Sequence, residues 1–191
     1  MALVDRVKNI LLTPKTEWGV IDTEPATVAD LYKNYIIPLA AIGPVASAIG
    51  ALAFGYRGFG ITYRPPIGTV LSSAVVTYLL TLGGVFVLAL IIDALAPSFG
   101  GTQNQVQALK VSAYSSTASW VAGIFGLIPV LSLLGVVGLY SLYLLYLGLP
   151  VLMKAPAEKA MGYTAVVIIA AIVLFLVVGL VAGSFMAGGL A

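Results

Sequence analysis

Long uncharged stretches separate short polar segments along most of this chain. Four runs contain no Asp, Glu, Lys or Arg, and they cover residues 34–56, 65–92, 111–153 and 160–191. A helix of about 20 apolar residues crosses the hydrocarbon core of a bilayer, because ~30 Å is covered at ~1.5 Å per residue. The third run, with 43 residues, is long enough for two crossings, and each of the others suffices for one. The pattern predicts an all-α integral membrane protein with a five-transmembrane-helix bundle.

Turn-forming and charged residues between these runs set the bounds of the spans. We expect crossings at about 34–55, 67–93, 108–127, 130–152 and 163–187. Residues 56–66, which contain Gly, Arg and Pro, predict a loop between the first two crossings, and residues 153–162 predict a charged loop before the last. Within the first crossing, Gly43-Pro44 predicts a kink. The chain thereby divides into an N-terminal segment, 1–33, and a transmembrane domain, 34–191.

The N-terminal segment opens with the period of an amphipathic helix at residues 3–12. Its apolar face comprises Leu3, Val4, Val7, Ile10 and Leu11, and its polar face comprises Asp5, Arg6, Lys8 and Asn9. The segment is too short to span, so it either lies along the bilayer interface or packs on the cytoplasmic face of the protein itself. Trp18 is expected at headgroup depth, where Trp side chains are enriched.

Composition agrees with a membrane location and removes most enzyme chemistry. Hydrophobic residues make up 61% and charged residues 8% of the chain, whereas soluble domains carry roughly a quarter charged residues. The chain contains no Cys and no His, which removes thiol nucleophiles, Ser–His pairs and the commonest metal ligands. We therefore predict no enzyme activity, no catalytic residues, no cofactor and no metal site. A net charge of +2 gives no reason to expect nucleic acid as a partner.

The distribution of Lys and Arg predicts the orientation. With the N-terminus inside, the inner segments hold seven basic residues and the outer segments hold only two, Arg57 and Arg64. Positive residues stay on the cytoplasmic side, so we expect a multi-pass protein of the cell membrane with its N-terminus in the cytoplasm and its C-terminus outside.

Small and hydroxyl residues recur at helical spacing in two of the spans. The second span carries Ser73, Thr77, Thr81 and Gly84, and the third carries Ser112, Ser116, Ser119 and Gly123. Such stripes let membrane helices pack closely, and they favour a compact bundle. The alternative is a polar crevice between the two helices.

Asp93 is the single most informative charged residue, because it ends a long uncharged run. Carboxylates at membrane depth are costly and mark candidate functional sites. Lys110 begins the next span, so one expectation is an interfacial pair between Asp93 and Lys110. The other is a cation or proton site that Asp93 forms with nearby amides, those of Gln103, Asn104, Gln105 and Gln107.

Tyr residues in the fourth span complete the candidate site. Tyr140 and Tyr143 lie deep enough that their hydroxyls need partners, which the serine stripe of the third span can supply. Packing or a ligand site would both explain them. The candidate polar cluster comprises Asp93, Gly100, Gly101, Gln103, Gln107, Lys110, Tyr114, Ser116, Tyr140 and Tyr143.

Several segments resemble one known family. They are Pro14–Trp18, Ser98–Gly101, Gln107–Lys110, Ala113–Trp120, Leu139–Pro150 and Met153–Pro156. Together they resemble the YIP domain in its prokaryotic form. The resemblance implies five transmembrane helices, a cytosolic N-terminus and a short outward C-terminus. Eukaryotic members act in vesicle trafficking and bind Rab-type GTPases, so a small GTPase partner follows for this chain by family analogy only.

These observations favour a non-enzymatic membrane scaffold or interaction protein, of a membrane-organisation or trafficking type. Its expected partners are the lipid bilayer and a second copy or another membrane protein. The alternative is a small-solute or ion transporter or channel, with Asp93 and the polar faces of the second and third helices along its path. A continuous polar crevice would favour transport, and a dry bundle would favour the scaffold.

Overall fold

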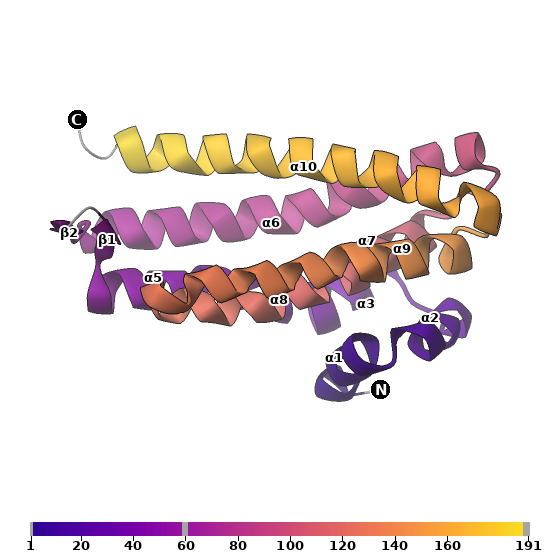
Figure 1. Ribbon diagram of the computed structural model, residues 1–191, viewed down its shortest axis with the longest axis horizontal. Helices are drawn as coiled ribbons and strands as arrows, with labels where there is room; N and C mark the ends of the chain where they lie inside the picture. The colour runs from indigo at the N-terminus through magenta and orange to yellow at the C-terminus, as the bar shows by residue number, and fades with distance from the viewer. Residues whose placement is uncertain (1, 59–60, 189–191) are drawn as a thin grey trace.

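The computed structural model describes residues 2–58 and 61–188, and nearly all of them are helical. Long helices lie side by side, and a small N-terminal layer covers one end of them (Figure 1). The N-terminal layer consists of α1 (Leu3–Leu12) and α2 (Pro14–Thr23). The long helices begin with α3 (Val28–Leu31), which continues through the π turn η1 (Tyr32–Ile36) and α4 (Ile37–Ala40) into α5 (Ile42–Phe54).

The remaining elements follow in chain order. They are β1 (Tyr56–Gly58), β2 (Ile61–Tyr63), α6 (Ile67–Leu95), the 3₁₀ turn η2 (Ala96–Phe99), α7 (Gln105–Ser115), α8 (Thr117–Ala122), the 3₁₀ segments η3 (Gly123–Leu127) and η4 (Pro129–Leu139), α9 (Tyr140–Leu152) and α10 (Ala157–Gly188). One layer holds α6 and α10, and the other holds α5, α8 and α9 (Figure 1).

Prolines shape the first long helix. Pro38 and Pro44 have no N–H to donate to the residue four positions earlier. The helix departs from α geometry just ahead of each one, as the π turn Tyr32–Ile36 and as a break at Ala41. Tyr78 of α6 donates its hydroxyl to the Ile37 carbonyl at 3.0 Å, and so ties this irregular stretch to the neighbouring helix.

Four helical stretches among the described residues are long and apolar enough to cross a membrane. They are Val28–Phe54, Ile67–Phe99, Val130–Leu152 and Ala157–Leu180. The remaining expected crossing, about 108–127, is helical but divided, because α7 ends at Ser115 and α8 gives way to 3₁₀ geometry at Gly123. The Ser116 hydroxyl bonds back to the Ser112 carbonyl at 2.7 Å, and such bonds compete with the helical ladder. The count of five crossings therefore stays a prediction.

A short antiparallel hairpin lies within the segment expected to be a loop. Tyr56 stands opposite Tyr63, and Arg57 stands opposite Thr62. Tyr, Ile and Thr favour extended backbone, which explains why the segment pairs with itself. The hairpin joins α5 to α6 at the end of the molecule opposite the N-terminal layer (Figure 1).

The N-terminal layer packs on the helical bundle through residues from both the apolar and the polar face of α1. Ile10 is fully buried, but Arg6, which belongs to the expected polar face, is buried as well. Val4 and Leu12 remain 75% and 69% exposed. The protein therefore buries residues from both the apolar and the polar face of α1.

Trp18 is enclosed by protein, and its expected position at headgroup depth stays a prediction. Its side chain is fully buried, and its ring lies directly against Gly148 of α9. A Cβ at position 148 would come within 2.7 Å of the indole ring. The close approach of α2 to α9 therefore requires glycine at this position.

We predict that Gly148→Ala destabilises the protein by about 1–3 kcal/mol relative to a matched glycine variant, because the methyl group overpacks a fixed ring. The matched variant is Gly83→Ala in α6, where an added Cβ meets no atom within 4 Å. Thermal unfolding in detergent measures both, and the comparison removes the helix-propensity gain that the two changes share. Equal midpoints for the two variants would contradict the prediction.

Candidate functional site

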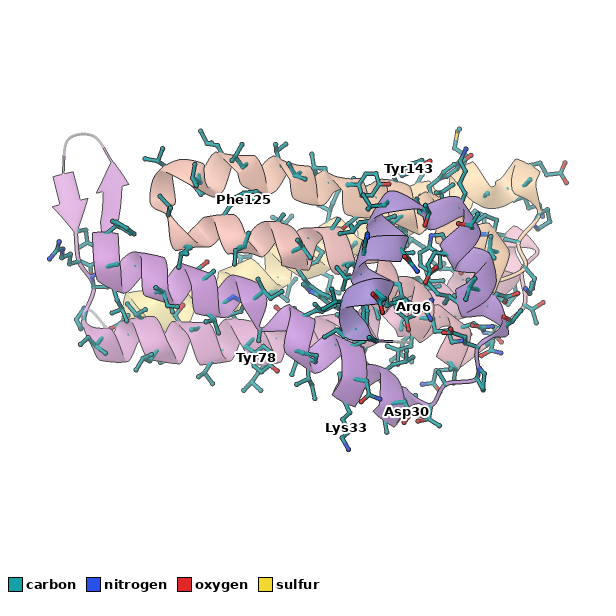
Figure 2. The ribbon with its side chains drawn as sticks, turned by 90° about the horizontal axis from the view of Figure 1, so that it is seen from below. Arg6, Asp30, Lys33, Tyr78, Phe125 and Tyr143 are labelled. Atoms are coloured by element: carbon teal, nitrogen blue, oxygen red, sulfur yellow. The ribbon has the colours of Figure 1, made fainter. Side chains whose placement is uncertain are left out.

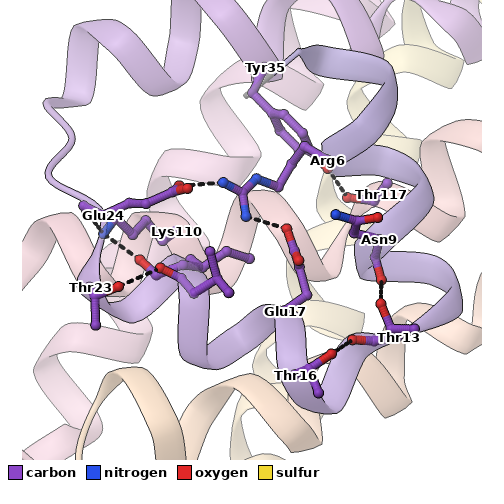
Figure 3. A network of polar contacts seen from close by, with 12 residues as sticks. Arg6, Asn9, Thr13, Thr16, Glu17, Thr23, Glu24, Tyr35, Lys110 and Thr117 are labelled. Carbon is purple, nitrogen blue, oxygen red and sulfur yellow. Dashed lines mark hydrogen bonds and ion pairs between the residues drawn. The ribbon is translucent and has the colours of Figure 1, made fainter.

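A buried guanidinium organises the N-terminal layer. Arg6 of α1 forms ion pairs with Glu17 of α2 and with Glu24, which follows α2 (Figure 3). Arg6 and Glu17 are both buried. Burial alone would lower the pKa of Arg6, but the hydrogen bond and charge of Glu24, together with the charge of Glu17, outweigh it and raise the pKa above its ordinary value. One side chain thus holds α1, α2 and the segment after α2 together.

Lys110 of α7 fastens this layer to the bundle. Its ammonium group donates to the Ile21 carbonyl at 2.9 Å and to the Glu24 carbonyl at 2.6 Å. Carbonyls at a helix C-terminus lack intrahelical partners and attract cations. Lys110 is only 3% exposed, so its charge is compensated by the end of α2. The expected interfacial pair with Asp93 does not form.

Asp22 provides a second connection between the two parts. Gln107 of α7 donates through Nε2 to the backbone oxygen and to Oδ1 of Asp22, each at 3.1 Å. Lys154, in the turn after α9, pairs with Oδ2 of Asp22 at 2.5 Å. We call the set that joins the layer to the bundle the polar interface; it comprises Arg6, Glu17, Asp22, Glu24, Gln107, Lys110 and Lys154.

Aromatic rings pack directly beneath the polar interface. The Arg6 guanidinium carbon lies 5.7 Å from the centroid of the Tyr114 ring, a distance that gives a cation–π attraction. Tyr114 also meets Trp18 and Tyr35 edge-on, at centroid distances of 6.3 and 4.5 Å. The Tyr35 hydroxyl shares a 2.7 Å hydrogen bond with the Thr117 hydroxyl. Tyr114 therefore connects the layer to the first long helix.

Tyr140 also contacts the N-terminal layer, and its hydroxyl does not bond to the serine stripe. Its hydroxyl donates to the Leu11 carbonyl of α1 at 3.1 Å, whereas the serine stripe had been expected to accept it. Tyr143 packs beside Tyr140 at a centroid distance of 5.4 Å and remains largely exposed near α1 (Figure 2). The stripe residue Ser119 instead meets Ser141 of α9 at 2.9 Å.

Asp93 lies apart from the polar interface, near the end of α6. Its Oδ1 atom is buried and has no hydrogen-bond partner in the part of the chain that the structure describes. On the adjacent turn of α10, the Tyr163 hydroxyl donates to the Ile92 carbonyl. The expected cluster of Asp93 with neighbouring amides does not assemble, because Gln107 binds Asp22 and Gln103 is exposed.

Gly100 and Gly101 have a packing role in the turn after α6. Gly100 has a φ of +73°, in the left-handed region that favours glycine. A Cβ on Gly101 would lie 2.6 Å from the Met153 carbonyl oxygen. The same oxygen accepts from the Thr102 N–H at 2.7 Å, so the two glycines let this turn rest on the turn after α9.

Comparison with known proteins decides the family. A family model for the Yip1 domain matches residues 8–179. The chain belongs to the Yip1 domain family. It is therefore a multi-pass membrane protein of a family that is not known for enzymes. No curated protein and no solved structure matches it.

The matched region covers almost all of the polar interface in this Yip1 domain protein, with Arg6 just outside it. Of the residues singled out from the sequence, Gln107, Lys110, Tyr114 and Tyr140 lie at the junction with the N-terminal layer, and Tyr143 packs beside Tyr140. The others, which are Asp93, Gly100, Gly101, Gln103 and Ser116, do not share one site with them. Sequence reasoning missed Lys154 and four residues of the N-terminal segment, Arg6, Glu17, Asp22 and Glu24. The concentration of nine charges in the first 33 residues was the available signal, although it does not reveal which charge meets which.

We predict that Lys110→Met loosens the N-terminal layer of the Yip1 domain protein. The change leaves two carbonyls without a donor, which costs about 1–3 kcal/mol. Trypsin can cut after Arg6, Lys8 and Lys15 once the layer detaches. We expect faster cleavage there than in wild type, and faster than in Lys33→Met, which removes an exposed lysine that projects away from the molecule (Figure 2). The same cleavage rate in both variants would contradict the role given to Lys110.

Proposed function

We propose that this protein is a prokaryotic-type, non-enzymatic membrane scaffold of membrane organisation or trafficking type, which presents its N-terminal layer to another membrane protein or to a second copy. The observation that carries the proposal is the polar interface. Lys110 and Lys154 hold the layer in one place on the bundle, and Arg6 holds the layer itself together. A layer fixed in this way offers a constant surface, whereas the exposed Val4 and Leu12 leave apolar area on it for a partner or for the bilayer interface. A small GTPase as the partner rests on family analogy alone.

The proposal includes five crossings, with the N-terminus in the cytoplasm and the C-terminus outside. The divided segment from Gln105 to Leu127 begins beside the polar interface, where Gln107 binds Asp22. Its other end reaches the far part of α5, because Gly50 lies directly against the Gly126 carbonyl. This segment therefore runs the length of α5 and supports a crossing of its own. The seven-to-two distribution of basic residues supports the orientation.

Topology reporters test this count of crossings. We expect a reporter fused after Asn104 to be cytoplasmic and one fused after Ile128 to be outside in the cell membrane. A chain in which residues 105–127 do not cross would place both reporters on one side. That outcome would remove the fifth crossing and the proposed position of the C-terminus.

Transport is the alternative, and one observation favours it. The predicted stripe Ser73, Thr77 and Thr81 faces a cavity that Ser116 and Ser119 also line. Asp93, the charge expected along a transport path, is not among the lining residues, and neither is Lys110. This arrangement supports the scaffold over an ion path.

Two measurements separate the candidates. We expect a photoreactive residue at Val4 or Leu12 to form a discrete protein adduct in native membranes, and one at the fully buried Ile10 to form none. Lys110→Met should weaken the adduct, because the layer then loses its fixed position. Adducts with lipid alone at both exposed positions would contradict the scaffold.

Flux into vesicles tests the transport candidate directly. We expect the purified protein to carry no small cations faster than protein-free vesicles do, and Asp93→Asn to change nothing. Flux that the wild type supports and Asp93→Asn abolishes would favour the transporter instead.

A further inference from the structure

A cavity of ≈ 410 Å³ lies between the two layers of long helices. Its walls come from α6 and α10 on one side and from α5, α8 and α9 on the other, the layers seen in Figure 1. The lining residues belong to the four stretches that are long and apolar enough to cross a membrane, or to the divided segment between Gln105 and Leu127. The Yip1 domain match and the scaffold proposal assign nothing to this space.

The cavity is long and narrow. Its wall on α6 extends from Val70 to Leu88, which is about 27 Å of helix at ~1.5 Å per residue. This length approaches the ~30 Å thickness of the hydrocarbon core. A volume of ≈ 410 Å³ spread over it makes a slot that runs parallel to the helices and not a rounded chamber.

The walls are neutral. Among the described residues that line the slot, none carries a charge. Most of its hydroxyls are already bonded within the protein: Thr81 donates to the Thr77 carbonyl at 2.8 Å, and Ser116 donates to the Ser112 carbonyl at 2.7 Å. Ser119 and Ser141 bond each other at 2.9 Å. Such walls hold no charge to compensate an ion, and most of their hydroxyl protons are already donated within the protein.

We propose that the slot binds one acyl chain of a phospholipid from the surrounding bilayer. The slot is only partly enclosed, because Phe175 on its wall is 61% exposed. An uncharged, elongated slot of this kind matches an uncharged, elongated acyl chain in shape and in polarity. The bilayer supplies such chains at high local concentration, and an empty slot would forfeit the contacts of its walls. Helices in lipid gain little from burying apolar surface against each other. A bound acyl chain can therefore make the contacts that the two layers do not make with each other along the slot.

The fluorescence of Trp120 can report directly on an acyl chain in the slot. Trp120 lines the slot and is only 7% exposed, so lipid outside the protein has little access to it. The other tryptophan, Trp18, is fully buried in the N-terminal layer. A quencher carried on an acyl chain therefore reaches Trp120 through the slot and leaves Trp18 bright.

The experiment uses the full-length protein in vesicles of phosphatidylcholine with dibrominated acyl chains, compared with vesicles of the same lipid without bromine. Bromine quenches tryptophan fluorescence on contact. We expect loss of the share of emission that belongs to Trp120, and no loss in Trp120→Phe. The absence of quenching in the wild type would overturn the proposal.

Adjacent positions on α6 provide matched variants. Gly84 lines the slot and Gly83 does not, and an added Cβ at either position meets no atom closer than 3.9 Å. Gly84→Phe should fill the slot and reduce the quenching at least twofold, whereas Gly83→Phe should quench as wild type does. If Gly84→Phe does not fold, Ala74→Phe fills the slot at another level, with Val75→Phe on the lipid-facing side as its control. Full quenching in the folded slot-filling variants would show that lipid reaches Trp120 by another route, and would overturn the proposal.

Discussion

The contact between the Lys110 ammonium and the carbonyl end of α2 is the constraint on which the arrangement of this protein depends. A cation that is 3% exposed loses most of its hydration, and isolated burial of that kind is costly. The Ile21 and Glu24 carbonyls restore what water would have given, and these are the oxygens that a helix leaves unpaired at its C-terminus. The end of α2 and the start of α7 thus satisfy each other, which fixes the N-terminal layer in place.

Other contacts at this junction follow from that position. Once α2 is held over α7, its Trp18 ring comes against α9, and only glycine at position 148 leaves room for it. Asp22 then lies within reach of both Gln107 and Lys154. Arg6 completes the layer by pairing with Glu17 and Glu24. In a buried network of this kind, removal of one partner costs more than the net stabilisation of the pair, because the other charge stays behind uncompensated.

Sequence reasoning gave the class of fold and part of the site, and the reason for its limits is physical. The uncharged runs predicted the four long helices that can cross a membrane. They could do so because the length and hydropathy of a helix are local properties of the sequence. The pairing of Lys110 depends on residues almost ninety positions earlier in the chain, and no local pattern distinguishes those carbonyls from the nearer Asp93. The amphipathic period placed Arg6 on the polar face of α1, but the period alone could not show that Glu17 and Glu24 pair with this side chain where it is buried. Ser73, Thr77 and Thr81 of one stripe and Ser116 and Ser119 of the other line a cavity, whereas Ser112 bonds to the Val85 carbonyl. The spacing alone could not distinguish helix packing from a cavity wall.

The slot and the polar interface share one packed core. Trp120, at the slot, lies 6.4 Å from Tyr35 between ring centroids, and Tyr35 lies 4.5 Å from Tyr114, which carries the Arg6 guanidinium on its face. Interiors of this density transmit displacements, because each side chain has little free space. An acyl chain in the slot that shifted Trp120 would displace Tyr35 and Tyr114, the rings that support the N-terminal layer. A ligand moves such an equilibrium only by its difference in affinity for the two arrangements, so the filled slot would favour whichever position of the layer leaves Trp120 best packed. Lipid occupancy and the surface offered to a partner would then depend on each other through these three rings.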